Sequence, residues 1–191
     1  NYLINLVNIR KYMFNRLVAL FLLTSIMIVT LSCSDNTKTS TPSMDLLTAI
    51  DKENIEIVQQ HIDTGTNINN YPIPEGIPLA GAHPLHLAVV KGNAEIVDLL
   101  LSNGADINLE ANNRDKATPL HWAVFFLQKE MVDLLIDSGA EINFIDANGT
   151  TPLDTANYTK VINIKDEKKL SIINEIMTAL SEKDALSASD L

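Results

Sequence analysis

The chain of 191 residues has one cysteine, one tryptophan and few aromatic residues of any kind, 5% in all. A single cysteine cannot form an intramolecular disulfide, so a disulfide-stapled fold is excluded. Basic residues are also outnumbered: 14 Lys and Arg stand against 24 Asp and Glu, which gives a formal net charge of −10. This charge disfavours nucleic acid as a partner and favours encounter with a basic protein, although solubility alone would also account for it.

Sequence signatures of catalysis are missing as well. No P-loop, dinucleotide fingerprint, nucleophile elbow or HExxH motif occurs in the chain. His83 and His86 are three residues apart, a spacing that could clamp a metal, but no cysteine or acidic residue accompanies them at a regular spacing. We therefore interpret the histidines as structural, and we predict a protein that is not an enzyme and needs no cofactor or metal.

What the sequence does contain is an internal repeat. The stretch His83–Asn108 (HPLHLAVVKGNAEIVDLLLSNGADIN) reappears as Thr118–Asn143 (TPLHWAVFFLQKEMVDLLIDSGAEIN). In each copy a proline near the first helical position, Pro84 or Pro119, is followed by apolar residues at spacings of three and four, which predicts a short helix. A second apolar helix follows and a glycine ends it. Neither helix pair can bury its apolar face alone, so the copies must stack on one another as a solenoid.

The opening of each copy resembles the TPLH-x-A motif of the ankyrin-repeat family. The motif stands as His83-Pro84-Leu85-His86-Leu87-Ala88, Thr118-Pro119-Leu120-His121-Trp122-Ala123 and Thr151-Pro152-Leu153-Asp154-Thr155-Ala156. The family's Gly-Ala-Asp-x-Asn motif stands as Gly104-Ala105-Asp106-Ile107-Asn108 and Gly139-Ala140-Glu141-Ile142-Asn143, and a degenerate first copy ends at Gly65-Thr66-Asn67-Ile68-Asn69.

The resemblance implies an all-α ankyrin-repeat solenoid of about four helix-turn-helix repeats joined by β-hairpin-like loops. The expected repeats cover residues 43–77, 78–112, 113–145 and 146–182, and a C-terminal tail covers residues 183–191. The resemblance also implies that Pro84, Pro119 and Pro152 begin the first helices, and that His86 and His121 tie neighbouring turns together by hydrogen bonds.

Four places depart from the repeat pattern. The loop at 70–78 carries about six extra residues and three prolines, so we expect it to be irregular. Lys116 replaces a turn glycine, and Leu127-Gln128 replaces the Gly92-Asn93 junction between helices, where either backbone strain or a shifted junction is expected. In the fourth copy the second helix is predicted at 170–180, which leaves 159–168 as an inserted loop or a helix extension.

In the ankyrin family the concave, partner-binding face is built from the ends of the first helices and from the hairpin tips. The resemblance therefore implies nine partner-binding residues, namely Val90, Lys91, Phe125, Phe126 and Tyr158 on the helices and Arg114, Asp115, Asn148 and Thr150 on the hairpins. Successive side chains on a helix are about 100° apart, so Phe125 and Phe126 cannot both face the core. At least one is expected to be an exposed anchor for a partner; alternatively, both pack against Tyr158 or the Leu127 junction.

The N-terminal region has a different character. The apolar run Leu17–Leu31 follows Arg10, Lys11 and Arg16, and it is too short to span a bilayer comfortably. These features are typical of a secretory signal peptide over residues 1–32, with its true start at Met13. The small residue Ser32 followed by Cys33 resembles a bacterial lipoprotein box, which implies lipidation of Cys33 and a flexible tether over 33–42. An uncleaved anchor and a plain thiol remain as alternatives.

Taken together, these features predict a monomeric, non-catalytic protein-binding module that is lipid-anchored in a bacterial cell envelope. Ser34 is not Asp, which favours the outer membrane. The partner is expected to be another protein with a basic surface, and the membrane is contacted through the lipid anchor only. Alternatives are an inhibitor or immunity-type protein that neutralises a basic partner, and a host-directed, surface-exposed interaction protein.

Overall fold

The computed structural model describes residues 41–191. The predicted signal peptide over 1–32, its predicted start at Met13 and the predicted lipidation of Cys33 therefore lie outside the described residues. The described part contains helices in pairs and no β-strand. In chain order the elements are α2 (Leu46–Asp51), α3 (Ile55–Asp63), α4 (Pro84–Lys91), α5 (Ala94–Ser102), α6 (Pro119–Phe125), α7 (Lys129–Asp137), α8 (Pro152–Ile162), α9 (Glu167–Ser181) and the 3-10 turn η1 (Ala188–Asp190). Within residues 41–191 no helix is long and apolar enough to cross a bilayer.

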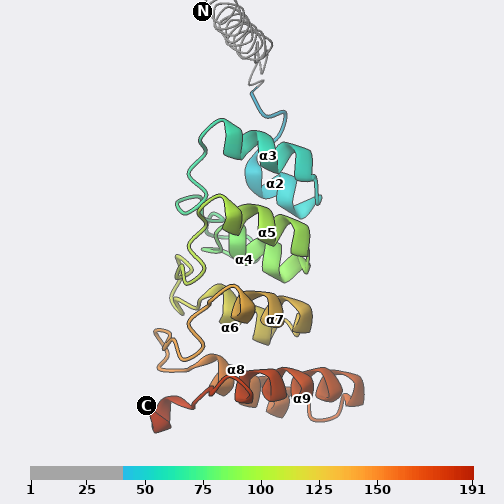
Figure 1. The fold of residues 1–191 in the computed structure, drawn as a ribbon, viewed down its shortest axis with the longest axis vertical. Coiled ribbons are helices and arrows are strands. Elements are labelled where there is room, and N and C mark those ends of the chain that lie inside the picture. Colours follow the sequence, from blue (N-terminus) through green and yellow to red (C-terminus); the bar gives the residue numbers. More distant parts are fainter. Residues whose placement is uncertain (1–40) are drawn as a thin grey trace, which may run out of the picture. The chain divides into compact units, whose positions relative to one another are not determined.

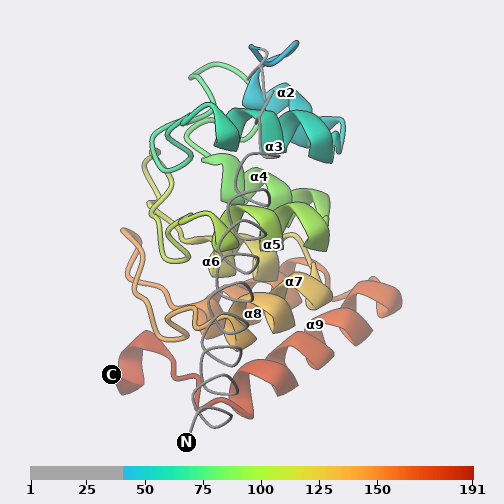
Figure 2. The same cartoon turned by 45° about the horizontal axis from the view of Figure 1, so that its top comes forward.

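The helix pairs stack in sequence order, from α2 and α3 at one end to α8 and α9 at the other (Figure 1). The first helices of the pairs form the inner row, in which neighbours contact one another: α2, α4, α6 and α8. The second helices of the pairs form the outer row in the same way: α3, α5, α7 and α9. Figure 2 shows the connecting loops gathered on one side of both rows. This arrangement confirms the predicted all-α solenoid of about four repeats.

The first residues of the helices explain why each helix begins where it does. The inner helices α4, α6 and α8 start at Pro84, Pro119 and Pro152, where the missing N–H costs no hydrogen bond and the fixed φ suits a helix. The outer helix α5 is capped by Asn93, whose side chain accepts a hydrogen bond of 3.0 Å from the Ile96 N–H. Proline thus begins three of the inner helices, and a short polar side chain caps α3, α5 and α9. Helix α2 is capped by Asp45 instead, and α7 has no side-chain cap.

One apolar core runs between the two rows through all four pairs. Its largest wholly buried side chains come from every repeat: Leu46, Ile50, Leu85, Ile96, Leu100, Leu120, Met131, Leu135, Ile173, Ile176 and Leu180. Burying one such aliphatic side chain stabilises a fold by about 1.5–3 kcal/mol. Because the core is shared between neighbours, the stability of each repeat depends on the repeats that flank it.

The third repeat keeps the helix junction of the second although Leu127 replaces Gly92. Leu127 has a left-handed φ of 59°, close to the 69° of Gly92. The hydrogen bond from the Gln128 N–H to the Ala123 carbonyl (2.9 Å) matches the one from the Asn93 N–H to the Ala88 carbonyl (3.2 Å). The junction is therefore strained and not shifted, since a left-handed conformation costs a residue with a Cβ about 1–2 kcal/mol.

Lys116 shows the same kind of strain in the third repeat's hairpin. Its φ is 51°, where Gly149 has a φ of 75° in the hairpin of the fourth repeat. Two turns of one repeat therefore adopt a glycine conformation without glycine.

The insertion in the fourth repeat is mostly helix. The inner helix α8 continues to Ile162, and α9 begins at Glu167, three residues before the predicted start at 170. The Asp166 carboxylate caps α9 by accepting a hydrogen bond of 3.1 Å from the Lys169 N–H. The predicted start was late because the first turn of α9 is polar, so the apolar periodicity begins only after it.

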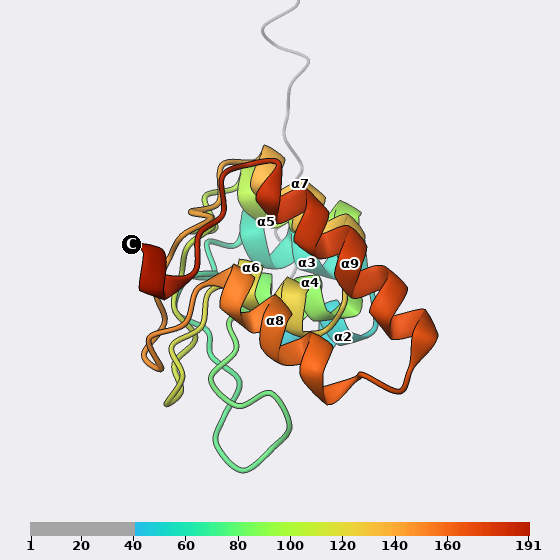
Figure 3. The ribbon, with the colours of Figure 1, turned by 90° about the horizontal axis from the view of Figure 1, so that it is seen from below.

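Residues 183–191, expected as a tail, pack against the fourth repeat (Figure 3). Asp184 has a φ of 59°, and the buried Ala185 donates its N–H to the Leu180 carbonyl at 3.1 Å. The Ala140 N–H donates to the Leu135 carbonyl at 2.9 Å in the same way. Asp184 and Ala185 thus repeat the Gly-Ala turn that follows α5 and α7.

The long loop of the first repeat is closed at its base. The Ile73 N–H donates to the Ala82 carbonyl, and the Gly81 N–H donates to the Ile73 carbonyl, both at 2.8 Å. Ile73 is buried, whereas Ile77 at the tip is exposed. The extra residues therefore form a side loop that leaves the stacking of the helix pairs unchanged.

Candidate functional site

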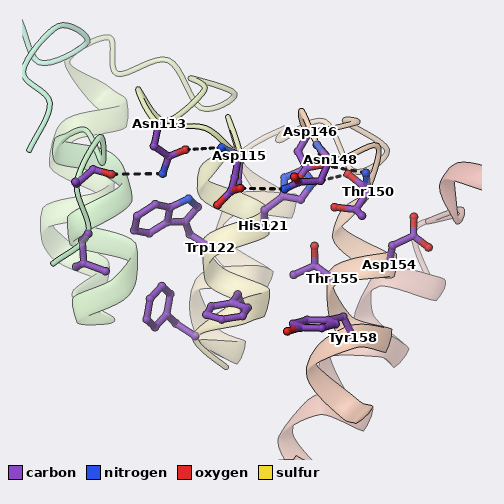
Figure 4. Close-up of a pocket in the computed structure, with 15 residues that line it drawn as sticks. Asn113, Asp115, His121, Trp122, Asp146, Asn148, Thr150, Asp154, Thr155 and Tyr158 are labelled. Carbon is purple, nitrogen blue, oxygen red and sulfur yellow. Dashed lines mark hydrogen bonds between the residues drawn. The ribbon is translucent and has the colours of Figure 1, made fainter. Parts of the chain in front are cut away.

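A groove with a volume of about 610 Å³ lies along the inner helices α6 and α8 and along the loops that precede the second to fourth helix pairs. It has two kinds of wall (Figure 4): polar side chains of the hairpin loops, among them Asn113, Asp115 and Asn148, and side chains of the inner helices, among them Trp122 and Tyr158. The complete lining is Leu79, Ala80, Asn113, Asp115, Ala117, His121, Trp122, Phe125, Phe126, Asp146, Asn148, Thr150, Asp154, Thr155 and Tyr158.

Most of the residues predicted to bind a partner line this groove. They are Asp115, Phe125, Phe126, Asn148, Thr150 and Tyr158. These six residues therefore lie in one groove, and their role in binding stays a prediction.

Three predicted residues lie elsewhere. Val90 is half-buried and packs against the core. The Lys91 ammonium lies 3.2 Å from Asp51 in the first repeat, and Arg114 is exposed on its hairpin outside the groove lining. The second repeat therefore contributes little side-chain chemistry to the groove.

The two adjacent phenylalanines are both accessible. Phe125 is 45% exposed and Phe126 is 37% exposed, because α6 ends at Phe125 and Phe126 is its C-cap. The two rings meet edge to face with centroids 5.3 Å apart, and Phe126 also lies 5.8 Å from the Trp122 ring. The end of α6 therefore presents an aromatic cluster to the groove.

Trp122 is a groove residue that the sequence prediction omitted. It occupies the variable position of the TPLH-x-A motif, where the second repeat has Leu87 and the fourth has Thr155. Its ring packs edge to face on His86 with centroids 5.3 Å apart, and only 9% of the residue is exposed. The sequence did contain a signal for Trp122, because the other two copies have a small or an aliphatic residue at this position.

The hairpin side of the groove is acidic. Asp146 accepts hydrogen bonds from the N–H groups of Asn148 and Thr150, both at 2.9 Å. The Asn148 amide also donates to Asp115 at 3.2 Å and makes a longer contact of 3.5 Å to Asp146. One amide thereby links the carboxylates of two neighbouring hairpins.

Asp154 is the third carboxylate of the groove and stands where the earlier repeats have a histidine. Burial raises the pKa of Asp154, but hydrogen bonds from Ser187, Ala188 and Thr151 outweigh that effect and lower it below its usual value. Asp154 accepts from the Ser187 hydroxyl at 2.6 Å and from the Ala188 N–H at 2.8 Å. Its main contacts therefore fix the C-terminal segment.

The two motif histidines join neighbouring repeats. His86 Nε2 lies 3.1 Å from the Ala117 carbonyl, and His121 Nε2 lies 3.1 Å from the Thr150 carbonyl. A carbonyl can only accept, so each ring carries its proton on Nε2. Burial lowers the pKa of His86 to about 3, and burial also lowers the pKa of His121. Both rings are therefore neutral at physiological pH.

His83 and His86, the two histidines that were considered as metal ligands, do not form such a site with other ligands in the described residues. The His83 and His86 ring centroids are 6.0 Å apart, and His83 Nδ1 is buried without a hydrogen-bond partner within the described part of the chain. Among residues 41–191 no three His, Cys, Asp or Glu side chains are grouped to hold a metal ion.

Stacked helix pairs, loops on one side and a groove along the inner row define the class of repeat protein that serves as a binding scaffold. A family model for ankyrin repeats in three copies matches residues 21–111, 46–146 and 109–164, more than half of the sequence, so the chain belongs to the ankyrin-repeat family. Ankyrin repeats bind proteins and are typically not catalytic.

Among curated proteins, the human 2-5A-dependent ribonuclease is 40% identical to this chain over 68 residues. The match covers 36% of this chain and 8% of the ribonuclease. The chain thus spans a small fraction of the length of that relative.

Proposed function

We propose that the protein is a non-catalytic binding module that holds another protein in the groove of its second to fourth repeats while lipid-anchored in a bacterial cell envelope. Membership of the ankyrin-repeat family supports a protein as the partner. The observation that carries the proposal is the exposure of three aromatic side chains, Phe125, Phe126 and Tyr158, in a groove of about 610 Å³. Aromatic side chains in a concave site are the usual anchors of an interface.

Exposure of these rings is costly unless a partner covers them. Tyr158 is 59% exposed and Phe125 is 45% exposed, although each would gain free energy from being buried at about 25 cal/mol per Å² of apolar area. Elsewhere in the second to fourth repeats, large aliphatic side chains fill the core between the helix rows. Ile145, Val161, Ile162 and Ile164 are exposed as well, but they do not line the groove. The groove is thus a concave site where a second molecule would bury several aromatic side chains together.

The anchor is supported by the sequence alone, through the basic and apolar segment before Cys33. Its test is metabolic labelling with a radioactive fatty acid in a bacterial host. Label should enter the intact chain and be lost in Cys33→Ala. Equal labelling of both chains would contradict the anchor, and it would leave the binding groove unaffected.

Binding at the groove is tested by a photo-crosslinking amino acid placed at Phe125 in the native envelope. The matched control places it at Ile145, which is 48% exposed and does not line the groove. A specific adduct at Phe125 and none at Ile145 is the expected result. Equal adducts at the two positions, or none at either, would reject the groove as the binding site.

A second candidate function is neutralisation of a basic partner, as an inhibitor or immunity-type protein. It is supported by the three groove carboxylates and by the net charge of −10. Such an interface associates rapidly and loses its rate advantage as salt rises. If the crosslinked partner associates at a rate that is independent of ionic strength, this candidate is wrong.

A further inference from the structure

The charges that line the groove have one sign. The lining includes the carboxylates of Asp115, Asp146 and Asp154, and none of the described residues in it is Lys or Arg. His121 adds no charge because burial lowers its pKa. A cleft with one sign of charge and apolar walls concentrates counter-charged ligands. The groove therefore favours a cation and disfavours an anion.

Two of the three carboxylates have oxygen atoms available for a ligand. Asp154 is engaged by Thr151, Ser187 and Ala188. By contrast, the shortest contacts of Asp146 reach only one of its oxygens, and Asp115 accepts a single bond of 3.2 Å from Asn148. The free acceptors thus come from two neighbouring hairpins and lie on either side of one amide (Figure 4).

Aromatic side chains line the same groove as these acceptors. Trp122, Phe125 and Phe126 come from α6, and Tyr158 comes from α8 across the groove. A ligand that meets both walls must offer several hydrogen-bond donors and also a surface that stacks on a ring. An ammonium group offers donors from a single point, whereas a guanidinium group is planar, carries five donors and stacks on aromatic faces.

We propose that the groove recognises an arginine side chain, with an apolar neighbour, presented by a segment of the partner protein. The guanidinium donates to Asp115 and Asp146 and stacks on the aromatic wall, while the apolar neighbour covers Phe125. This inference rests on the proposed function, because it names the chemistry of the partner at that same groove.

The test begins with selection of a random peptide library displayed on phage against the full chain in mild detergent. The same chain carrying Phe125→Ser and Tyr158→Ser, which removes the aromatic surface without adding charge, serves for counter-selection. Peptides that bind only the unmodified chain are expected to share an arginine next to an apolar residue. Groove-dependent peptides without arginine would overturn the inference and leave the proposed function standing. A complete lack of groove-dependent peptides would overturn both.

The selected peptide is then measured by calorimetry in three forms, with arginine, with lysine and with citrulline at the same position. Citrulline keeps the shape of arginine and removes its charge. Loss of the charged hydrogen bonds should weaken binding about tenfold or more, and lysine should fall between the two. Equal affinity of the arginine and citrulline forms would show that the guanidinium charge is not recognised, and the inference would be wrong.

Variants of the protein locate the effect. Asp115→Asn with Asp146→Asn removes two charges and keeps one oxygen acceptor on each side chain, so it should weaken the arginine peptide more than the citrulline peptide. The matched control, Glu95→Gln with Asp98→Asn, removes the same charge from the exposed face of α5. If the control weakens the arginine peptide as much as the groove variant does, the attraction is a property of net charge and the proposed site is wrong.

Discussion

The second and third repeats have the same backbone and different groove surfaces. Their inner helices, α4 and α6, both start at proline, and both present a buried histidine to the carbonyl of the next hairpin. Two positions at the end of each inner helix differ: Val90 packs against the core and Lys91 pairs with Asp51, whereas Phe125 and Phe126 are exposed in the groove. Residues common to the two copies carry the stacking, and residues that differ carry the surface chemistry.

The comparison extends to backbone strain. The second repeat uses Gly92 at the junction between its helices, and the third repeat tolerates Leu127 in the same left-handed conformation. A stack with a shared core can hold such a residue in place because many neighbouring contacts determine its position. Strain and an altered surface therefore occur together in the third repeat.

The largest expected effect on stability comes from removing His86 or His121, the two histidines that join neighbouring repeats. His86→Ala should lower the free energy of unfolding by about 3 kcal/mol, because it leaves a cavity and removes one of the two hydrogen bonds that the Ala117 carbonyl accepts. His121→Ala should cost somewhat less, since His121 is slightly less buried. Urea unfolding followed by circular dichroism measures both. A loss below about 1 kcal/mol for either would show that the histidines do not hold the repeats together.

The second effect is a dependence of stability on pH. The pKa of His86 is about 3 in the folded protein and has its ordinary value of 6.5 in the unfolded chain, so the unfolded chain binds the proton first. Stability is therefore fully present above pH 6.5 and falls as the pH drops, by about 1.4 kcal/mol per pH unit. His86→Gln should reduce this slope between about pH 6.5 and 5. An unchanged slope would place the pH dependence on other groups.

The third effect is the cost of placing a residue with a Cβ at Gly92, as the third repeat does with Leu127. Gly92→Leu should destabilise the fold by about 1–2 kcal/mol, because a Cβ is unfavourable at positive φ. In addition, a Cβ at Gly92 would lie 2.8 Å from the Gln128 side-chain oxygen. Thermal unfolding of Gly92→Leu and Gly92→Ala separates the backbone cost from the cost of the larger side chain. A neutral Gly92→Leu would mean that the junction is freely adaptable in both repeats.

The smallest effect is a gain in stability. Lys116→Gly should stabilise the protein by up to about 1 kcal/mol, since glycine adopts the observed φ of 51° without strain. The substitution also removes an exposed ion pair of 3.5 Å with Glu110, which is worth little in water. Glu110→Gln measures that loss separately. A net destabilisation larger than that of Glu110→Gln would contradict the assignment of strain to Lys116.

Local signals in the sequence predicted the helix pairs well. Pro84, Pro119 and Pro152 fix where the inner helices start, because proline acts within a single turn. The start of α9 was predicted late, since its first turn is capped by Asp166 and has no apolar face. A helix start can therefore be predicted from its own first turn when that turn contains a proline or an apolar pattern.

The groove was less predictable because its residues act across repeats. Lys91 was expected in the groove, but its side chain reaches Asp51, 40 residues earlier in the sequence. Asp146 was not predicted, and it becomes part of the groove only because Asn148 links its hairpin to that of Asp115. Contacts between stacked copies decide such roles, and no pattern within one copy contains them.

Trp122 is the only tryptophan in the chain, and it stands in the groove wall against Phe126 with 9% of its surface exposed. The intrinsic fluorescence of the protein therefore comes mainly from one indole at the proposed binding surface. A segment seated on that wall excludes the remaining water and moves the emission to shorter wavelength, whereas unfolding hydrates the indole and moves it to longer wavelength. The protein thus carries its own optical probe, and the direction of the shift distinguishes occupancy from denaturation.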